Sequence, residues 1–110
     1  MDCVALGDQG AVLMGRRLGC EIHAAARRTA FDQASVMRNV KTDHAFISLG
    51  DNKPCAGCED PNLIADLWHI RSRVEARVVT WLFPQDVDAA RAVEEVAHAH
   101  MDRIILIRRK

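Results

Sequence analysis

Residues 60–84 read DPNLIADLWHIRSRVEARVVTWLFP and contain a helix signal that is followed at once by a strand signal. Asp60 is a suitable N-cap and Pro61 suits the first helical position. Apolar residues then recur at helical spacing, at Leu63, Ile64, Leu67, Ile70 and Val74. The run 76–83 is apolar almost throughout and stops at Pro84, as is typical of a strand buried on both faces. We therefore expect a helix over 61–74 and a strand over 76–83.

The same alternation extends through the rest of the chain. Further strands are expected over 2–6, 20–25, 44–49 and 103–107, and further helices over 11–18, 30–40 and 87–101. Strands that alternate with helices through short connections favour a mostly parallel sheet covered on both faces. We predict an α/β fold, a three-layer α/β/α sandwich whose five-stranded sheet has the flavodoxin-like order 2-1-3-4-5.

Composition narrows the class of protein. The 110 residues are 49% hydrophobic and 27% charged, and 15 basic residues balance 15 acidic ones. This length suits a single domain over residues 1–110. No apolar run approaches the roughly 20 residues of a membrane span, and a neutral chain is a poor candidate for nucleic-acid binding. Neutrality instead favours a protein partner or a homo-oligomer. The start, Met1-Asp2, lacks signal-peptide features, so the cytoplasm is the expected location.

The strand order predicts where a ligand would bind. Ligands of open parallel sheets bind at the carboxyl ends of the strands, where the order reverses, here between the first and third strands. The loops expected at that point are GDQG (7–10) and GDNK (50–53), and each follows a strand ending in Leu-Gly. Glycine allows a sharp turn and a close approach of the backbone to a ligand. The candidate pocket residues are Gly7, Asp8, Gln9, Gly50, Asp51 and Asn52.

These loops also carry a resemblance. The stretches VALGDQ (4–9) and ISLGDNK (47–53) resemble the Gly-Asp-Ser and Gly-x-Asn blocks of SGNH/GDSL-type hydrolases. The chain as a whole is similar to short members of that family from phages and proteobacteria. The resemblance implies an SGNH-like fold, a serine nucleophile after Gly-Asp, an oxyanion-stabilising asparagine, and a general base in a later Asp-x-x-His block.

The chain departs from that pattern at the residues that carry the chemistry. Gln9 occupies the serine position, and a carboxamide is not a nucleophile. The stretch 24–29 lacks the family's second-block glycine, and the sequence stops three residues after Ile107, before an Asp-x-x-His block would be expected. Triad residues act as a unit, so we expect a pseudoenzyme with a vestigial pocket, no cofactor, and a binding or assembly role. If the chain is phage-encoded, a virion-associated location is the alternative to the cytoplasm.

Two other functions stay open. An active esterase with a rewired site would need Ser48, Asp51 or a cysteine to replace the missing nucleophile. A thiol or zinc module would use Cys55 and Cys58, a C-x-x-C pair that supplies half of a tetrahedral site. The alternative interpretations of that pair are two cysteine thiols in a loop without a special role, or a redox-active disulfide. With four cysteines, a disulfide scaffold is not expected, and Cys3 is interpreted as a small core residue.

The remaining aromatic and histidine residues favour structural roles. His44 and His23 lie near strand boundaries and are interpreted as boundary residues rather than bases. His98 and His100 do not share a helix face, and their placement near a helix C-terminus suits the helix dipole. Trp68 and Trp81 are expected to serve in core or rim packing.

Overall fold

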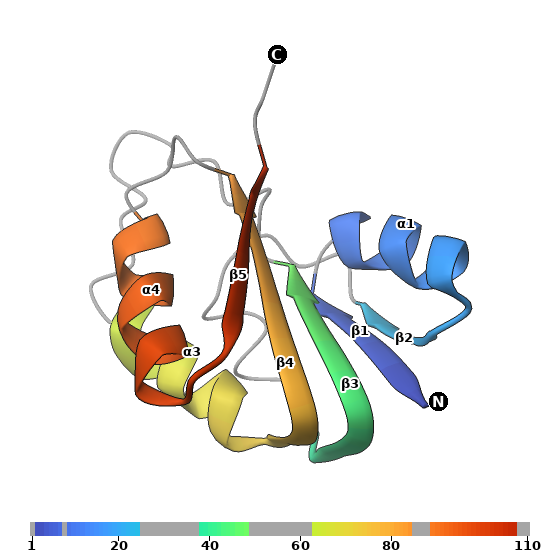
Figure 1. Cartoon of the computed structure of the whole chain (residues 1–110), viewed down its shortest axis with the longest axis horizontal. Helices are drawn as coiled ribbons and strands as arrows, with labels where there is room; N and C mark the ends of the chain where they lie inside the picture. The colour runs from blue at the N-terminus through green and yellow to red at the C-terminus, as the bar shows by residue number, and fades with distance from the viewer. Residues whose placement is uncertain (1, 8, 25–37, 49–62, 85–88, 108–110) are drawn as a thin grey trace.

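The computed structural model describes residues 2–7, 9–24, 38–48, 63–84 and 89–107 (Figure 1). The strands are β1 (Cys3–Gly7), β2 (Glu21–Ala24), β3 (Val40–Ser48), β4 (Val74–Pro84) and β5 (Arg103–Ile107), and the described helices are α1 (Gln9–Leu18), α3 (Leu63–Ser72) and α4 (Ala89–Ala99). All strand pairs are parallel, and the sheet order is β2-β1-β3-β4-β5. The predicted α/β sandwich and its 2-1-3-4-5 order are confirmed.

The helices divide unequally between the two faces of the sheet. Figure 1 shows α3 and α4 side by side on one face and α1 on the other. The α3/α4 face carries the main core, in which Leu67, Ile70, Val93 and Val96 of the helices meet Trp81 and other strand residues that are almost fully buried. The α1 face has a smaller cluster, formed by Ala5, Ala11 and Cys20 with Cys3 and Phe46 at its edge.

Two strands begin earlier than the sequence pattern predicts. The first described pair between β3 and β4 is Val40 with Val74, and the Val40 N–H donates to the Arg73 carbonyl at 2.8 Å. Val74 is therefore a strand residue rather than the last residue of the preceding helix, which ends at Ser72. Pairing between distant segments overrides local helix periodicity here. Of the helix expected over 30–40, residues 30–37 lie outside the described part, and residue 40 is in β3.

Two apolar residues within the helices expected over 61–74 and 87–101 are exposed. Ile64 on α3 is 43% exposed, and Met101 after α4 is 93% exposed. Met101 has a φ of 56°, and the following Asp102 N–H donates to the Ala97 carbonyl at 2.8 Å. This closed turn ends α4 at Ala99 and directs Met101 into solvent. The two tryptophans differ as well, because Trp81 is fully buried while Trp68 is 39% exposed.

A disulfide links Cys3 at the start of β1 to Cys20 just before β2. The two Cα atoms are 4.8 Å apart, and 17 positions separate the cysteines in the sequence. Helix α1 runs between them and ends at Leu18. The next residue, Gly19, has a φ of 71° and allows the Cys20 N–H to donate to the Gly15 carbonyl at 2.9 Å. The expectation that Cys3 is only a small core residue is incomplete, because the turn at Gly19 brings Cys20 back beside β1.

Removing this disulfide is expected to destabilise the β1–α1–β2 unit. A Cys3→Ala/Cys20→Ala variant should lose about 3 kcal/mol of unfolding free energy in urea titrations, because its unfolded chain is no longer constrained by a closed loop. A reducing agent should lower the stability of the wild-type chain by a similar amount and leave the double variant nearly unchanged. Equal stability of the wild-type chain with and without reductant would contradict the pairing.

Asp102 connects three elements of the main core. Its carboxylate accepts from Arg71 Nε at 2.7 Å, from Arg71 Nη2 at 3.1 Å and from Trp81 Nε1 at 3.0 Å. Arg71 Nη1 also donates to the Val74 carbonyl at 2.9 Å. The Asp102 side chain is only 3% exposed and that of Arg71 13%, so the ion pair is largely removed from solvent. Every oxygen of this buried carboxylate therefore has a partner.

Loss of the Asp102 carboxylate should be among the most damaging single changes in the fold. Asp102→Ala leaves the Arg71 guanidinium and the Trp81 N–H without their partner, and breaking a buried pair in this way costs about 3–5 kcal/mol. Asp102→Asn keeps an acceptor for Trp81 and should cost less. The measurement is urea unfolding, with exposed Glu95→Ala as the control, expected within about 0.5 kcal/mol of the wild-type chain. A loss for Asp102→Ala no larger than that of the control would contradict this role.

Candidate functional site

The fold places the carboxyl ends of β1 and β3 side by side, as the predicted pocket requires. Gly7 at the end of β1 pairs with Ser48 at the end of β3. Gly7 has a φ of 122°, and a Cβ atom at this position would overlap the Ser48 carbonyl oxygen. Glycine is therefore required here by the close approach of two strands. The glycine of the Gly-Asp block thus has a structural cause that is independent of any chemistry.

The rest of the predicted pocket is only partly described. Gln9 is the first residue of α1, which agrees with a loop that turns directly from β1 into a helix. The other predicted site residues lie outside the described part of the chain: Asp8, Gly50, Asp51, Asn52, Cys55 and Cys58. The structure therefore brings the β1 and β3 ends together, and the arrangement of the pocket side chains remains a prediction.

A second group of side chains, polar and aromatic, lies on the α1 face of the sheet, centred on His44. His44 is in the middle of β3 rather than at its boundary, because β3 begins at Val40. Its Nε2 lies 3.0 Å from Thr80 Oγ1 on β4, and its ring stacks on Phe46 with the ring centres 4.1 Å apart. Two neighbours thus fix the imidazole, one by hydrogen bonding and one by packing.

Arg103 completes this group from the neighbouring strand. Thr80 pairs with Arg103 across β4 and β5, so both project from the α1 face. The pKa of His44 is lowered from its ordinary value of 6.5, first by burial and second by the positive charge of Arg103. No carboxylate among the described residues forms a salt bridge with Arg103, which is exposed. Within the described part of the chain, the group therefore carries a positive charge without an ion-pair partner, beside a histidine that is neutral at pH 7.

We call the part of the α1 face that lies over β3, β4 and β5 the open face, formed by His44, Phe46, Val78, Thr80, Arg103 and Ile105. Helix α1 packs on β1, β2 and β3, whereas β4 and β5 receive α3 and α4 on the opposite face. Ile105 is 50% exposed and Val78 is half-buried. Thr80 is only 2% exposed, and its hydroxyl is satisfied by His44. Leu82, on the same side of β4, is only 4% exposed, so the exposed side chains of this face are those of Arg103 and Ile105 on β5.

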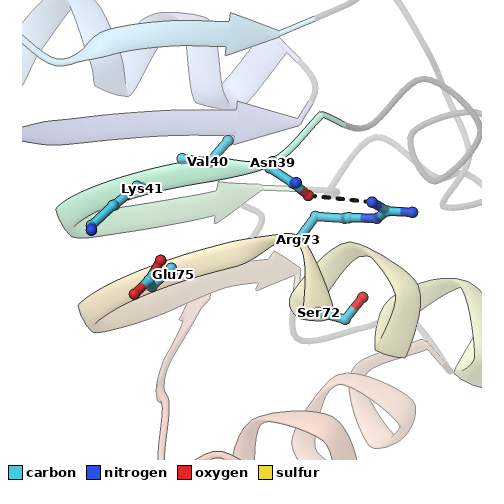
Figure 2. A pocket seen from close by; sticks show the side chains of 6 residues that line it. All are labelled: Asn39, Val40, Lys41, Ser72, Arg73 and Glu75. Carbon is cyan, nitrogen blue, oxygen red and sulfur yellow. Dashed lines mark hydrogen bonds between the residues drawn. The ribbon is translucent and has the colours of Figure 1, made fainter.

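A shallow polar depression lies at the other end of the sheet (Figure 2). Its volume is about 280 Å³, and it is lined by Asn39, Val40, Lys41, Ser72, Arg73 and Glu75. Arg73 Nη1 donates to Asn39 Oδ1 at 3.3 Å across it. The depression lies at the amino ends of β3 and β4, away from the strand ends where open parallel sheets bind ligands. Its lining mixes basic and acidic side chains and therefore does not favour a ligand of either charge.

Two other histidines, His100 and His23, have side-chain partners. His100 Nδ1 donates to the Val96 carbonyl at 2.8 Å, and its ring lies against Trp68 with centres 4.9 Å apart. His23 Nε2 lies 3.0 Å from Glu21 Oε1 on the exposed edge strand β2. No group of three or more histidine, cysteine or acidic side chains in the described part of the chain is arranged to hold a metal ion. None of the described helices is long and apolar enough to cross a membrane.

The fold defines a class, a parallel α/β sandwich with flavodoxin-like strand order. Comparison with protein-family models, curated proteins and solved structures finds no match to this chain. The His44 group is the feature that sequence reasoning missed. Its only signal is the recurrence of polar residues in apolar strands, at His44, Thr80 and Arg103.

The charge of Arg103 provides a direct test of this geometry. Arg103→Gln should raise the pKa of His44 towards 6.5, and burial, the larger cause, should still keep it below that value. An NMR pH titration of the His44 ring measures the change, and exposed Arg91→Gln on α4 is the control. Because the folded pKa is lowered, the unfolded chain takes up this proton first, and the contribution of His44 to stability is lost as pH falls below 6.5. If the His44 pKa is unchanged in Arg103→Gln, the Arg103 guanidinium does not lie close enough to His44 to affect its charge.

Proposed function

We propose that this chain is a non-catalytic, SGNH-like α/β domain that works by binding a partner protein. The observation that carries the proposal is the open face, where Ile105 is half exposed, Val78 and Phe46 are half-buried, and Arg103 has no salt bridge to any described residue. Parallel sheets normally have both faces covered. Exposed apolar surface with arginine beside it is typical of interaction sites.

The residues at the predicted pocket support binding over hydrolysis. Gln9 stands in the serine position of the SGNH pattern and begins α1. Ser48, one replacement nucleophile in a rewired esterase, is only 3% exposed at the end of β3 and is poorly placed to meet a substrate. The two other replacements, Asp51 and a cysteine of the C-x-x-C pair, lie outside the described residues.

The proposed location follows from the cysteines. The sequence favours the cytoplasm, or a virion if the chain is phage-encoded. The Cys3–Cys20 disulfide favours an assembled particle or another oxidising setting, because structural disulfides rarely persist in a reducing cytosol. A thiol or zinc module at Cys55 and Cys58 is the third candidate, and a thiol count with metal analysis of the native protein tests it.

An esterase assay tests the proposed absence of catalysis. The wild-type chain should not hydrolyse short-chain acyl esters above the buffer rate and should not be labelled by a fluorophosphonate probe. Asn52→Ala and Ser48→Ala should behave in the same way, because neither residue stabilises a transition state in a binding domain. An ester turnover in the wild-type chain that falls about 100-fold or more in Asn52→Ala, the loss typical of an oxyanion donor, would overturn the proposal in favour of a rewired hydrolase.

A further inference from the structure

The described buried residues fall into two clusters, and the Cys3–Cys20 disulfide belongs to the smaller one. The main core draws on β1, β3, β4, α3 and α4, and β1 contributes Val4 and Leu6 to it. Among the described buried residues, α1 and the segment leading into β2 contribute only to the smaller cluster, through Ala11 and Cys20. Strand β1 is therefore anchored in the main core, whereas α1 and β2 are attached outside it.

Helix α1 meets the sheet through small residues. Ala11 is fully buried, and a Cβ atom added at Gly15 would overlap the Ile22 side chain, so the helix backbone lies close to β2. The larger side chains of Leu13 and Leu18 are instead 59% and 53% exposed. Because a docked helix owes most of its stability to buried apolar area, α1 is held weakly by packing. The covalent link just beyond its C-terminal end is correspondingly important.

The disulfide closes a loop that contains the whole of α1. It joins the start of β1 to the residue before β2, so that even an opened α1 is tethered at both ends. A closed loop has fewer open conformations, and a disulfide around a loop of this length shifts the opening equilibrium towards the closed form by about 100-fold. Among the described strands, β2 is at the edge of the sheet and pairs with β1 alone.

A reductant can reach this disulfide from the Cys3 side, because Cys3 is half-buried whereas Cys20 is only 8% exposed. A thiolate of a dithiol attacks Cys3 Sγ, forms a mixed disulfide and releases Cys20 as a thiolate. The second thiolate of the reagent then displaces Cys3, and the dithiol ends as a cyclic disulfide. The protein gains two electrons and, after protonation, two thiols.

We propose that the Cys3–Cys20 pair is a redox switch whose reduction by a dithiol allows α1 and β2 to open as one unit, while the rest of the described sheet stays folded with α3 and α4. Opening of this kind, confined to one cooperative unit, is a general property of folded proteins. It uncovers Ala5 and Phe46, which pack in the smaller cluster, and moves the start of α1 away from the ends of β1 and β3. The inference goes beyond the proposed binding function and does not depend on it.

Trypsin reports on this opening, because α1 contains Arg16 and Arg17, which are exposed in the closed helix. A helix must unfold locally before a protease can cut it, so the cleavage rate follows the population of the open form. Dithiothreitol should raise the initial rate of cleavage after Arg16 and Arg17 about 100-fold, as followed by mass spectrometry. In the same reduced sample, cleavage after exposed Arg77 on β4 and exposed Arg91 on α4 should be about ten-fold slower or more.

The Cys3→Ala/Cys20→Ala variant is the matched control. It should be cut in α1 as fast as the reduced wild-type chain, and dithiothreitol should not change its rate, which separates this pair from Cys55 and Cys58. Removal of dithiothreitol and addition of oxidised glutathione should restore slow cleavage to the wild-type chain only.

Two results would overturn the inference. Equal cleavage rates after Arg17 and Arg91 in the reduced chain would show that the whole chain opens together, and an α1 rate that ignores dithiothreitol would show that the disulfide does not hold the unit closed. The wild-type measurement needs no substitution, so it decides the matter even if the double variant fails to fold. Neither result bears on the proposed function, which the esterase assay tests separately.

Discussion

The buried contact of Asp102 with Arg71 and Trp81 determines how the C-terminal half of the fold is assembled. The Asp102 N–H closes the end of α4, while its carboxylate holds the end of α3 and the middle of β4. A buried ion pair of this kind adds little net stability over an apolar core, but it fixes one arrangement of the elements that it joins. Asp102 immediately precedes β5, whose first residue, Arg103, pairs with Thr80 of β4.

The strand order could be predicted because it depends on local signals that agree with one another. Apolar runs that end in glycine or proline and alternate with capped helices leave few topologies. The starts of β3 and β4 could not be predicted, because Val40 and Val74 become strand residues only by pairing with each other. Likewise, Met101 fits the apolar helix pattern and yet is exposed, since the turn that ends α4 depends on its left-handed backbone.

For the candidate sites too, some features could be predicted from the sequence and others could not. The proximity of the β1 and β3 ends follows from strand order alone, and Gly7 confirms that they approach closely. The Cys3–Cys20 pairing and the His44 group depend instead on register, which the sequence does not encode locally. A shift of one residue in β4 would turn Thr80 to the α3/α4 side and Trp81 to the α1 side, removing the hydroxyl from His44. The strand expected over 44–49 made His44 a boundary residue, and only the observed pairing of β3 with β4 shows its neighbours.

The hydrogen bond between His44 and Thr80 satisfies a buried hydroxyl of the open face from within the chain. Thr80 is nearly inaccessible to solvent, and an unsatisfied hydroxyl there would cost about 1–3 kcal/mol. His44 satisfies it from within the chain, and the lowered pKa of His44 keeps the imidazole neutral at pH 7, so that its charge does not add to that of Arg103. The buried Thr80 hydroxyl thus has its hydrogen-bond partner within the chain, while the Arg103 guanidinium is exposed to solvent. The hydrogen bonding of this buried hydroxyl therefore does not depend on any group outside the described residues.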